Sequence, residues 1–112
     1  VYGNIDNHKL RIILNEELLF KCEEVNIFMT HIAGYPGKYS KGITHKIKMY
    51  KPNLIISGHS HILKVMNDKK NNLLFMNPGA AGNYGIHKVK TIVKFNIDGK
   101  DIKELKIIEV EK

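Results

Sequence analysis

The chain has 112 residues and a formal net charge of +7, which allows one domain with a modest core and excludes a multidomain chain. Its single cysteine, Cys22, excludes an internal disulfide framework and favours a reducing, cytoplasmic location. No apolar run approaches the ~18–20 residues that a membrane-spanning helix needs, so we expect no membrane span and no secretory signal.

The positive charge comes almost entirely from lysine, since Arg11 is the only arginine. The lysines occur singly or in pairs, and aromatic residues do not alternate with them as a base-stacking surface would require. We therefore expect a solvated basic surface with a mild attraction for anionic substrates. The pattern argues against a nucleic-acid partner.

The first part of the chain predicts a helical turn, a hairpin and a loop. Residues 7–17 are polar and mixed, which favours a loop with a short helical turn. Apolar runs at 18–22 and 25–30 predict two strands, joined as a hairpin at Glu23 and Glu24. The next stretch is broken by glycine and proline, which predicts a loop over the strand ends, built on Gly34, Pro36 and Gly37.

One helix is clear from its periodicity. Ile43, Ile47 and Tyr50 keep helical spacing, with Ser40 as the expected N-terminal cap and Pro52 as the stop. The remaining apolar runs predict strands, separated by polar or small-residue loops. They lie at 53–57, 62–66, 73–76, 89–97 and 102–110, with a small-residue loop at 77–82 and a hairpin turn at Asp98-Gly99.

Polar side chains follow three of the predicted strand ends. His59 and His61 come directly after a buried strand, and in extended backbone they would point the same way. His31 follows the strand before it, and residues 1–6 look like the tail of a third strand, which ends in Asn4 and Asp6. Open α/β folds place ligands at the carboxyl edge of the sheet. Imidazole and oxygen donors without thiolates favour a catalytic divalent metal site over a structural zinc site.

Four short motifs stand in this order along the chain: Gly3-Asn4-Ile5-Asp6, Thr30-His31, Gly58-His59-Ser60-His61 and Asn77-Pro78-Gly79. Together they resemble the motifs of the calcineurin-like metallophosphoesterases, and within that family those of the small bacterial phosphodiesterase branch. The resemblance implies an α/β fold, a two-sheet β-sandwich flanked by helices in four layers, with two divalent metals at the strand ends. It also implies metal-dependent hydrolysis of a small phosphodiester substrate.

The resemblance also implies individual roles. Asn4 would bind a metal through its amide oxygen and donate to the substrate phosphate, while His31 and His59 would bind the same metal and His61 the other. The Asn77-Pro78-Gly79 turn would be structural. Two metals would lower the pKa of a bridging water and clamp the phosphoryl oxygens. Mn²⁺ is the expected metal, with Ni²⁺, Mg²⁺, Zn²⁺ or Fe as alternatives.

Two departures from the family pattern change what is expected. The family's Asp-x-His and Gly-Asp motifs are absent, so residues 1–112 look like the C-terminal portion of one such domain. We expect this chain alone to bind at most one metal and to be a poor catalyst. A missing N-terminal segment or a second copy would cover the exposed sheet. Ile5 stands where many members have His, so Asp6 would orient a ligand or a water, or simply cap the turn.

Other interpretations remain open. A retromer subunit shares this fold but works through protein contacts, so the alternative function is an inactive scaffold. Of the other histidines, His8 and His45 show no partner pattern, and His87 could line the pocket from the loop before the last hairpin.

Overall fold

The computed structural model describes residues 1–112, which form two helices and nine strands. In chain order these are α1 (His8–Ile13), β1 (Glu17–Cys22), β2 (Val25–Thr30), β3 (Gly34–Tyr35), β4 (Lys38–Tyr39), α2 (Ile43–Tyr50), β5 (Leu54–Ser57), β6 (Leu63–Asp68), β7 (Leu73–Pro78), β8 (Val89–Asp98) and β9 (Asp101–Glu111). The predicted strand pairs and the two helical segments are confirmed. Neither helix is both long and apolar enough to cross a membrane.

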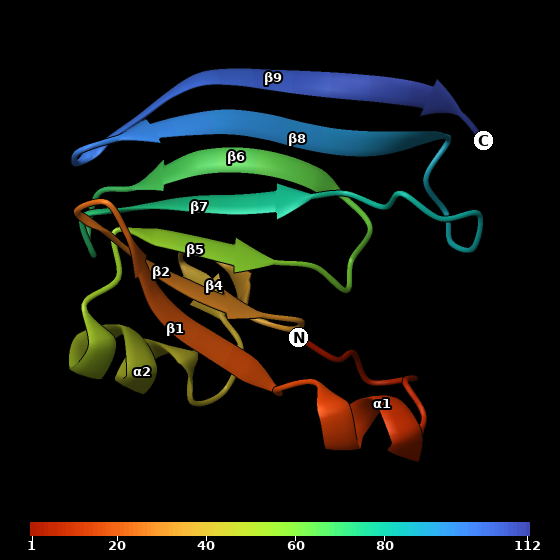
Figure 1. Cartoon of the computed structure of the whole chain (residues 1–112), viewed down its shortest axis with the longest axis horizontal. Coiled ribbons are helices and arrows are strands. Elements are labelled where there is room, and N and C mark those ends of the chain that lie inside the picture. Colours follow the sequence, from red (N-terminus) through yellow and green to blue (C-terminus); the bar gives the residue numbers. More distant parts are fainter.

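A five-stranded sheet organises the fold, in the order β1-β2-β5-β7-β6. The three inner strands β2, β5 and β7 are mutually parallel, and the outer strands β1 and β6 are antiparallel to their neighbours. Figure 1 shows the arrows of β2, β5 and β7 pointing to the same edge. The segments that carry His31 and the pair His59 and His61 leave the sheet at this edge, because each follows the carboxyl end of an inner strand. Residues 1–6 form no strand, so the expectation of a strand ahead of Asn4 is wrong.

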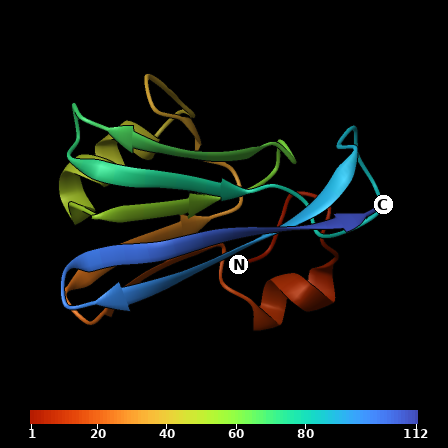
Figure 2. The same ribbon diagram turned by 90° about the horizontal axis from the view of Figure 1, so that it is seen from above.

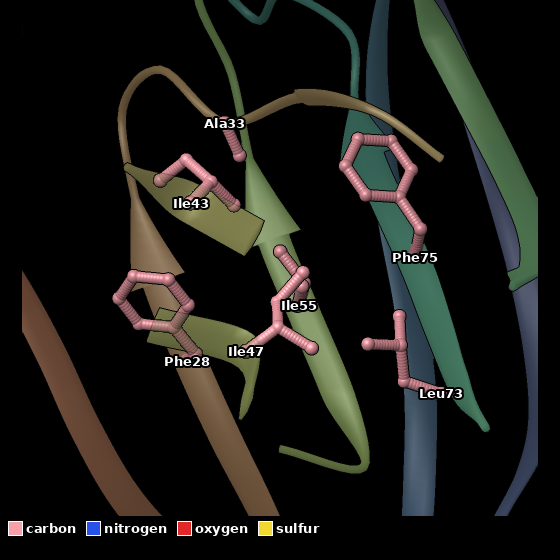
Figure 3. Close-up of a cluster of buried hydrophobic side chains, with 7 residues drawn as sticks. All are labelled: Phe28, Ala33, Ile43, Ile47, Ile55, Leu73 and Phe75. Carbon is pink, nitrogen blue, oxygen red and sulfur yellow. The ribbon is translucent and has the colours of Figure 1, made fainter. Parts of the chain in front are cut away.

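One face of the sheet is covered by α2. Phe28, Ile55 and Phe75 project from the inner strands, and Ile43 and Ile47 pack on them from the helix. Figure 3 shows this cluster, which is completed by Ala33 and Leu73. The two isoleucines are four residues apart and so lie on the same helix face. Burial of that face is what docks the helix on the sheet.

The opposite face is covered by the long β8–β9 hairpin. Val25, Ile27, Leu54 and Met76 form a second buried cluster, against which side chains of the hairpin pack, namely Val93, Phe95, Ile97 and Ile102. In Figures 1 and 2, α2 and the hairpin lie on opposite sides of the sheet. The expected α/β fold, a two-sheet β-sandwich flanked by helices, is confirmed, with α2 as the helix that packs on the five-stranded sheet.

Two local details differ from the expectation for the helix and the loop before it. The N-cap of α2 is Gly42, at φ +87°, with no side-chain cap, while Ser40 contributes only its carbonyl to the amide of Ile43. The stretch expected to be an irregular loop contains the β3–β4 ribbon, which turns at Gly37 with φ +85°. The ribbon forms because Tyr35 and Tyr39 can pack on the ring of Phe75.

The turn of the last hairpin is shifted by one residue from the predicted position. Asp98 pairs with Asp101, so Gly99 and Lys100 form the two-residue connection. Gly99 has φ +62° and Lys100 does not have positive φ, which is the pattern of a type II′ turn. Right-handed strand twist favours this turn type in two-residue hairpins.

A buried carboxylate ties the β3–β4 ribbon to the sheet. Asp68, at the end of β6, accepts hydrogen bonds from the Tyr39 hydroxyl at 2.6 Å and from the Asn71 side chain at 2.8 Å. Burial alone would raise the pKa of Asp68, but the hydrogen bonds from Asn71 and Tyr39 outweigh it and lower this pKa below its ordinary value. Burial, together with the bond to Asp68, raises the pKa of Tyr39.

Replacing Asp68 with asparagine should cost about 1–3 kcal/mol of unfolding free energy at pH 7, because the amide nitrogen cannot accept these bonds. The lowered pKa gives the native carboxylate a stabilising effect that is present above its ordinary pKa of 3.8 and lost as pH falls through the native value. Urea denaturation at pH 7 and pH 3 should therefore show the gap between wild type and Asp68→Asn narrowing in acid. The exposed Asp101→Asn is the control, and a gap independent of pH would contradict the assignment.

Candidate metal centre

The turn that carries Asn4 is held by side chains on both sides of it. The Asp6 carboxylate accepts a 2.6 Å hydrogen bond from the Gly3 amide. From α1, Arg11 donates to the carbonyl of Asn4 at 2.9 Å and to the carbonyl of Asp6 at 3.0 Å, and its guanidinium lies 5.0 Å from the ring centre of Tyr2. Sequence reasoning noted Arg11 only as the lone arginine and missed this role. The turn therefore keeps the Asn4 side chain in one position.

The loops after β2 and β5 are tied together by backbone pairing. Thr30 and Ser57 are register partners at the ends of the two parallel strands. The Gly58 amide then donates to the carbonyl of His31 at 2.9 Å, and the Ser57 hydroxyl holds the Ala33 amide at 3.0 Å. These bonds place His31 directly beside the loop that carries the other two histidines.

Asn4, His31 and His59 converge through their polar atoms. The Asn4 Oδ1 atom lies 3.0 Å from Nε2 of His31 and 3.2 Å from Nδ1 of His59. The two imidazole rings are 5.2 Å apart and nearly perpendicular. A Cβ at Gly3 would come within 3.1 Å of the His31 ring, so any larger residue would have to displace this ring by a few tenths of an ångström. Three donors from separate segments thus point to one place, and two imidazoles with an amide oxygen suit a divalent transition metal.

No three side chains of His, Cys, Asp or Glu come together as a metal-binding group. In the ligand set that the motif resemblance implies, the amide oxygen of Asn4 would be the third donor beside His31 and His59. These three residues would offer a divalent metal two neutral nitrogens and one neutral oxygen, without a carboxylate. Such a set leaves the Lewis acidity of a bound cation largely intact.

The backbone of the histidine loop is not extended. His59 has φ +72° and His61 has φ +64°, so both lie in the left-handed region, which costs a non-glycine residue of order 1–3 kcal/mol. The expectation that extended geometry would aim both rings at one point is wrong. The loop turns at each histidine instead. Tertiary contacts must hold this conformation, because local propensity does not favour it.

Asn77 holds the histidine loop from β7. Its buried side-chain amide donates to the Gly58 carbonyl at 3.0 Å and to the Ser60 hydroxyl at 3.1 Å, and its Oδ1 accepts from the Gly79 amide at 3.0 Å. The Tyr35 hydroxyl also hydrogen-bonds to Ser60. The Asn77-Pro78-Gly79 turn is thus structural, and through Asn77 it fixes the loop that carries His59 and His61.

All four predicted ligands line one open pocket of about 500 Å³, a size typical of small-molecule sites. His61 lies in this pocket but does not join Asn4. Its ring packs edge-on against the ring of His87, with centroids 5.4 Å apart. His61 is therefore available to a different cation from the one that His31 and His59 would hold. Ile5 lies 91% exposed at the rim.

The electrostatics favour neutral imidazole at the centre of the cluster. Burial is the main cause that lowers the pKa of His31, and the nearby His59 and His61 lower it further, while Asp6 acts in the opposite direction. A neutral His31 keeps a nitrogen lone pair for a metal. The Asp6 carboxylate accepts a hydrogen bond from the Gly3 amide, so it caps the turn that carries Asn4, which is one of the two roles expected for it. The other role, in catalysis, stays a prediction.

Residues 1–100 match the family model of the calcineurin-like phosphoesterase superfamily domain. The chain therefore belongs to the calcineurin-like phosphoesterase superfamily, whose members use divalent metals. No curated protein sequence matches the chain.

Several solved structures share the fold. Vps29 of Entamoeba histolytica complexed with Zn²⁺ is 20% identical with a TM-score of 0.70, over 99% of this chain and 67% of that one. An archaeal phosphodiesterase is 22% identical with a TM-score of 0.69, over 97% of this chain and 66% of its own. The Thermotoga maritima protein TM1076 is 25% identical with a TM-score of 0.63, over 96% and 64%. The chain thus spans about two thirds of the length of these structures.

Proposed function

We propose that the protein is a metal-dependent hydrolase of phosphodiesters. The observation that carries this proposal is the position of the Asn4 amide oxygen between two imidazole nitrogens, at 3.0 Å from His31 and 3.2 Å from His59, at the carboxyl edge of the sheet. Membership of the superfamily and the shared fold of an archaeal phosphodiesterase support the class of reaction and substrate. Mn²⁺ is the metal we propose, and a Vps29 relative with Zn²⁺ makes Zn²⁺ the first alternative.

Each residue has a distinct task in this proposal. His31 and His59 present their ring nitrogens to one cation, and Asn4 adds its oxygen, which leaves its NH₂ group free to donate to a phosphate oxygen. His61 serves the second position in the same pocket. Bound divalent metals would supply Lewis acidity and a water of lowered pKa. The basic surface of the chain favours approach of an anionic substrate.

A dinuclear centre also needs anionic ligands to hold two dications together. Asp6 is the only carboxylate lining the pocket, and it is hydrogen-bonded to Gly3. We therefore propose that further carboxylate ligands come from a preceding segment of the protein or from a second copy. Residues 1–112 by themselves would bind one cation at the Asn4 cluster and turn over slowly.

A scaffold that works through protein contacts is the second candidate, because Vps29 structures are among those that share this fold. A Vps29 structure also holds Zn²⁺, so metal binding alone does not separate the two candidates. What favours the enzyme is the Asn4 amide, which beside His31 and His59 keeps a free NH₂ group for a phosphate oxygen.

The test is hydrolysis of bis-p-nitrophenyl phosphate by the full-length protein with Mn²⁺, with and without EDTA. We expect turnover that EDTA abolishes and that His59→Ala lowers about 10²–10³-fold, because a lost metal contact removes several kcal/mol of charge stabilisation in the transition state. His45→Ala, on the exposed side of α2, is the matched control. Turnover that is insensitive to EDTA, or an unaffected His59→Ala enzyme, would reject the proposed site.

A further inference from the structure

The hydrogen bonding of the His87 ring is incomplete in the structure. Its Nε2 lies 2.8 Å from the carbonyl oxygen of Gly82, so Nε2 carries the proton and donates. In the neutral ring, Nδ1 is then an acceptor with a free lone pair. This Nδ1 atom is buried and has no hydrogen-bond partner. An unsatisfied buried acceptor costs about 1–3 kcal/mol, which calls for a donor nearby.

The donor available to His87 is the ring of His61. Both Nδ1 atoms approach the point where a Cβ on residue 85 would stand: that of His87 is 2.9 Å from it, and that of His61 is closer still. Gly85, at φ +129°, leaves this space open. Any other residue at position 85 would fill the space between the two rings.

The segment that carries His87 is also anchored. The Lys112 ammonium donates to the carbonyl of Gly85 at 2.7 Å and to the carbonyl of His87 at 2.9 Å. With the bond from His87 to Gly82, these contacts hold both the backbone and the ring of His87. A residue held in this way can orient a neighbouring ring.

We propose that His87 is the positioning residue of His61. In this arrangement the Nδ1–H of His61 donates to Nδ1 of His87, whose Nε2–H donates to the carbonyl of Gly82. The two rings are nearly perpendicular in the structure, and a rotation of the His61 ring forms the first of these bonds. His61 is thereby held as the Nδ1–H tautomer, with its Nε2 lone pair directed into the pocket for a cation. The inference rests on the proposed function, because it takes His61 as a metal ligand.

General metal-site chemistry supports this arrangement. A histidine that binds a metal through one nitrogen almost always donates its other N–H to an acceptor, and loss of that acceptor weakens metal binding about 10–100-fold. The backbone around His61 offers it no hydrogen bond of this kind, and no side chain other than His87 presents a free buried acceptor. The Nδ1–H of His61 thus lacks another acceptor, and Nδ1 of His87 lacks another donor, so a hydrogen bond between them satisfies both atoms.

The experiment is a Zn²⁺ titration of the full-length protein followed by long-range ¹H–¹⁵N NMR of the histidine rings. The affinity is taken from the ring signals of His61, in the wild type and in His87→Ala and His87→Asn. Asparagine places its Oδ1 close to the position of Nδ1 and so keeps the acceptor. We expect His87→Ala to weaken Zn²⁺ binding at His61 about 10–100-fold and His87→Asn to restore most of the loss. The exposed His45→Ala should change nothing.

The NMR spectra provide a readout independent of affinity. In the Zn²⁺-bound wild type, His61 should be protonated at Nδ1 and His87 at Nε2. An unprotonated Nδ1 on His61, or wild-type affinity in His87→Ala, would overturn the role of His87. If the His61 ring signals do not respond to saturating Zn²⁺ at all, His61 is not a ligand and the proposed metal site itself fails. If His87→Ala does not fold, the wild-type tautomers and the asparagine variant still decide the question.

Discussion

Substituting His31 with alanine should weaken the binding of Mn²⁺ or Zn²⁺ by at least about 100-fold. Loss of a residue that only hydrogen-bonds to a metal ligand already weakens metal binding about 10–100-fold. His31 supplies one of the two nitrogens that flank the Asn4 oxygen, at 3.0 Å. Its removal leaves one imidazole and one neutral amide oxygen, which together hold a divalent cation poorly. Isothermal titration calorimetry gives the dissociation constant directly.

His8→Ala is the matched control for this variant, because His8 lies exposed at the start of α1 and makes no contact with the cluster. Its affinity should equal that of the wild type. Equal affinity in His31→Ala would mean that the convergence on Asn4 has no role in metal binding, and the proposed hydrolase function would lose its main support.

Substituting Asn77 with alanine should destabilise the protein by about 2–4 kcal/mol and also weaken metal binding. The side chain is 1% exposed, and its loss leaves the Gly58 carbonyl and the Gly79 amide without partners; each buried unsatisfied group costs about 1–3 kcal/mol. The second effect follows because His59 and His61 depend on this contact to stay in the left-handed region. Urea denaturation and a Zn²⁺ titration measure the two effects.

Two further variants separate these effects. Asn77→Asp keeps the acceptor for Gly79 but loses the amide donor to Gly58 and Ser60, so it should retain part of the stability and little of the metal affinity. Asn83→Ala, in the exposed loop after β7, should leave both unchanged. Wild-type metal affinity in a folded Asn77→Ala protein would show that the histidine loop holds its shape without Asn77.

Much of the fold could be predicted because its signals are local. The alternating run 89–97 predicted β8, the spacing of Ile43 and Ile47 predicted α2, and these elements are present. The errors concern details that local pattern does not decide. Ser40 was expected to cap α2, but the chain turns at Gly42, whose left-handed backbone needs no side-chain cap.

The sequence could predict which residues form the candidate site, but not how they are arranged in space. The strand ends and the motif resemblance indicated Asn4, His31, His59 and His61, and one pocket contains all four. The contacts of Arg11 with the Asn4 turn gave no sequence signal, because they join an exposed helix to backbone carbonyls several residues away.

By itself, the sequence determined where most strands lie along the chain, the periodicity that buries them, and the histidines that follow two of their carboxyl ends. Only the tertiary structure decided how those residues meet. Asn77 and Tyr35 hold His59 and His61 in a backbone conformation that their own propensities oppose, and Gly85 leaves the room in which His61 and His87 approach each other. The reason is physical: hydrophobic periodicity acts over a few residues, whereas these side-chain positions depend on contacts between segments far apart in the chain.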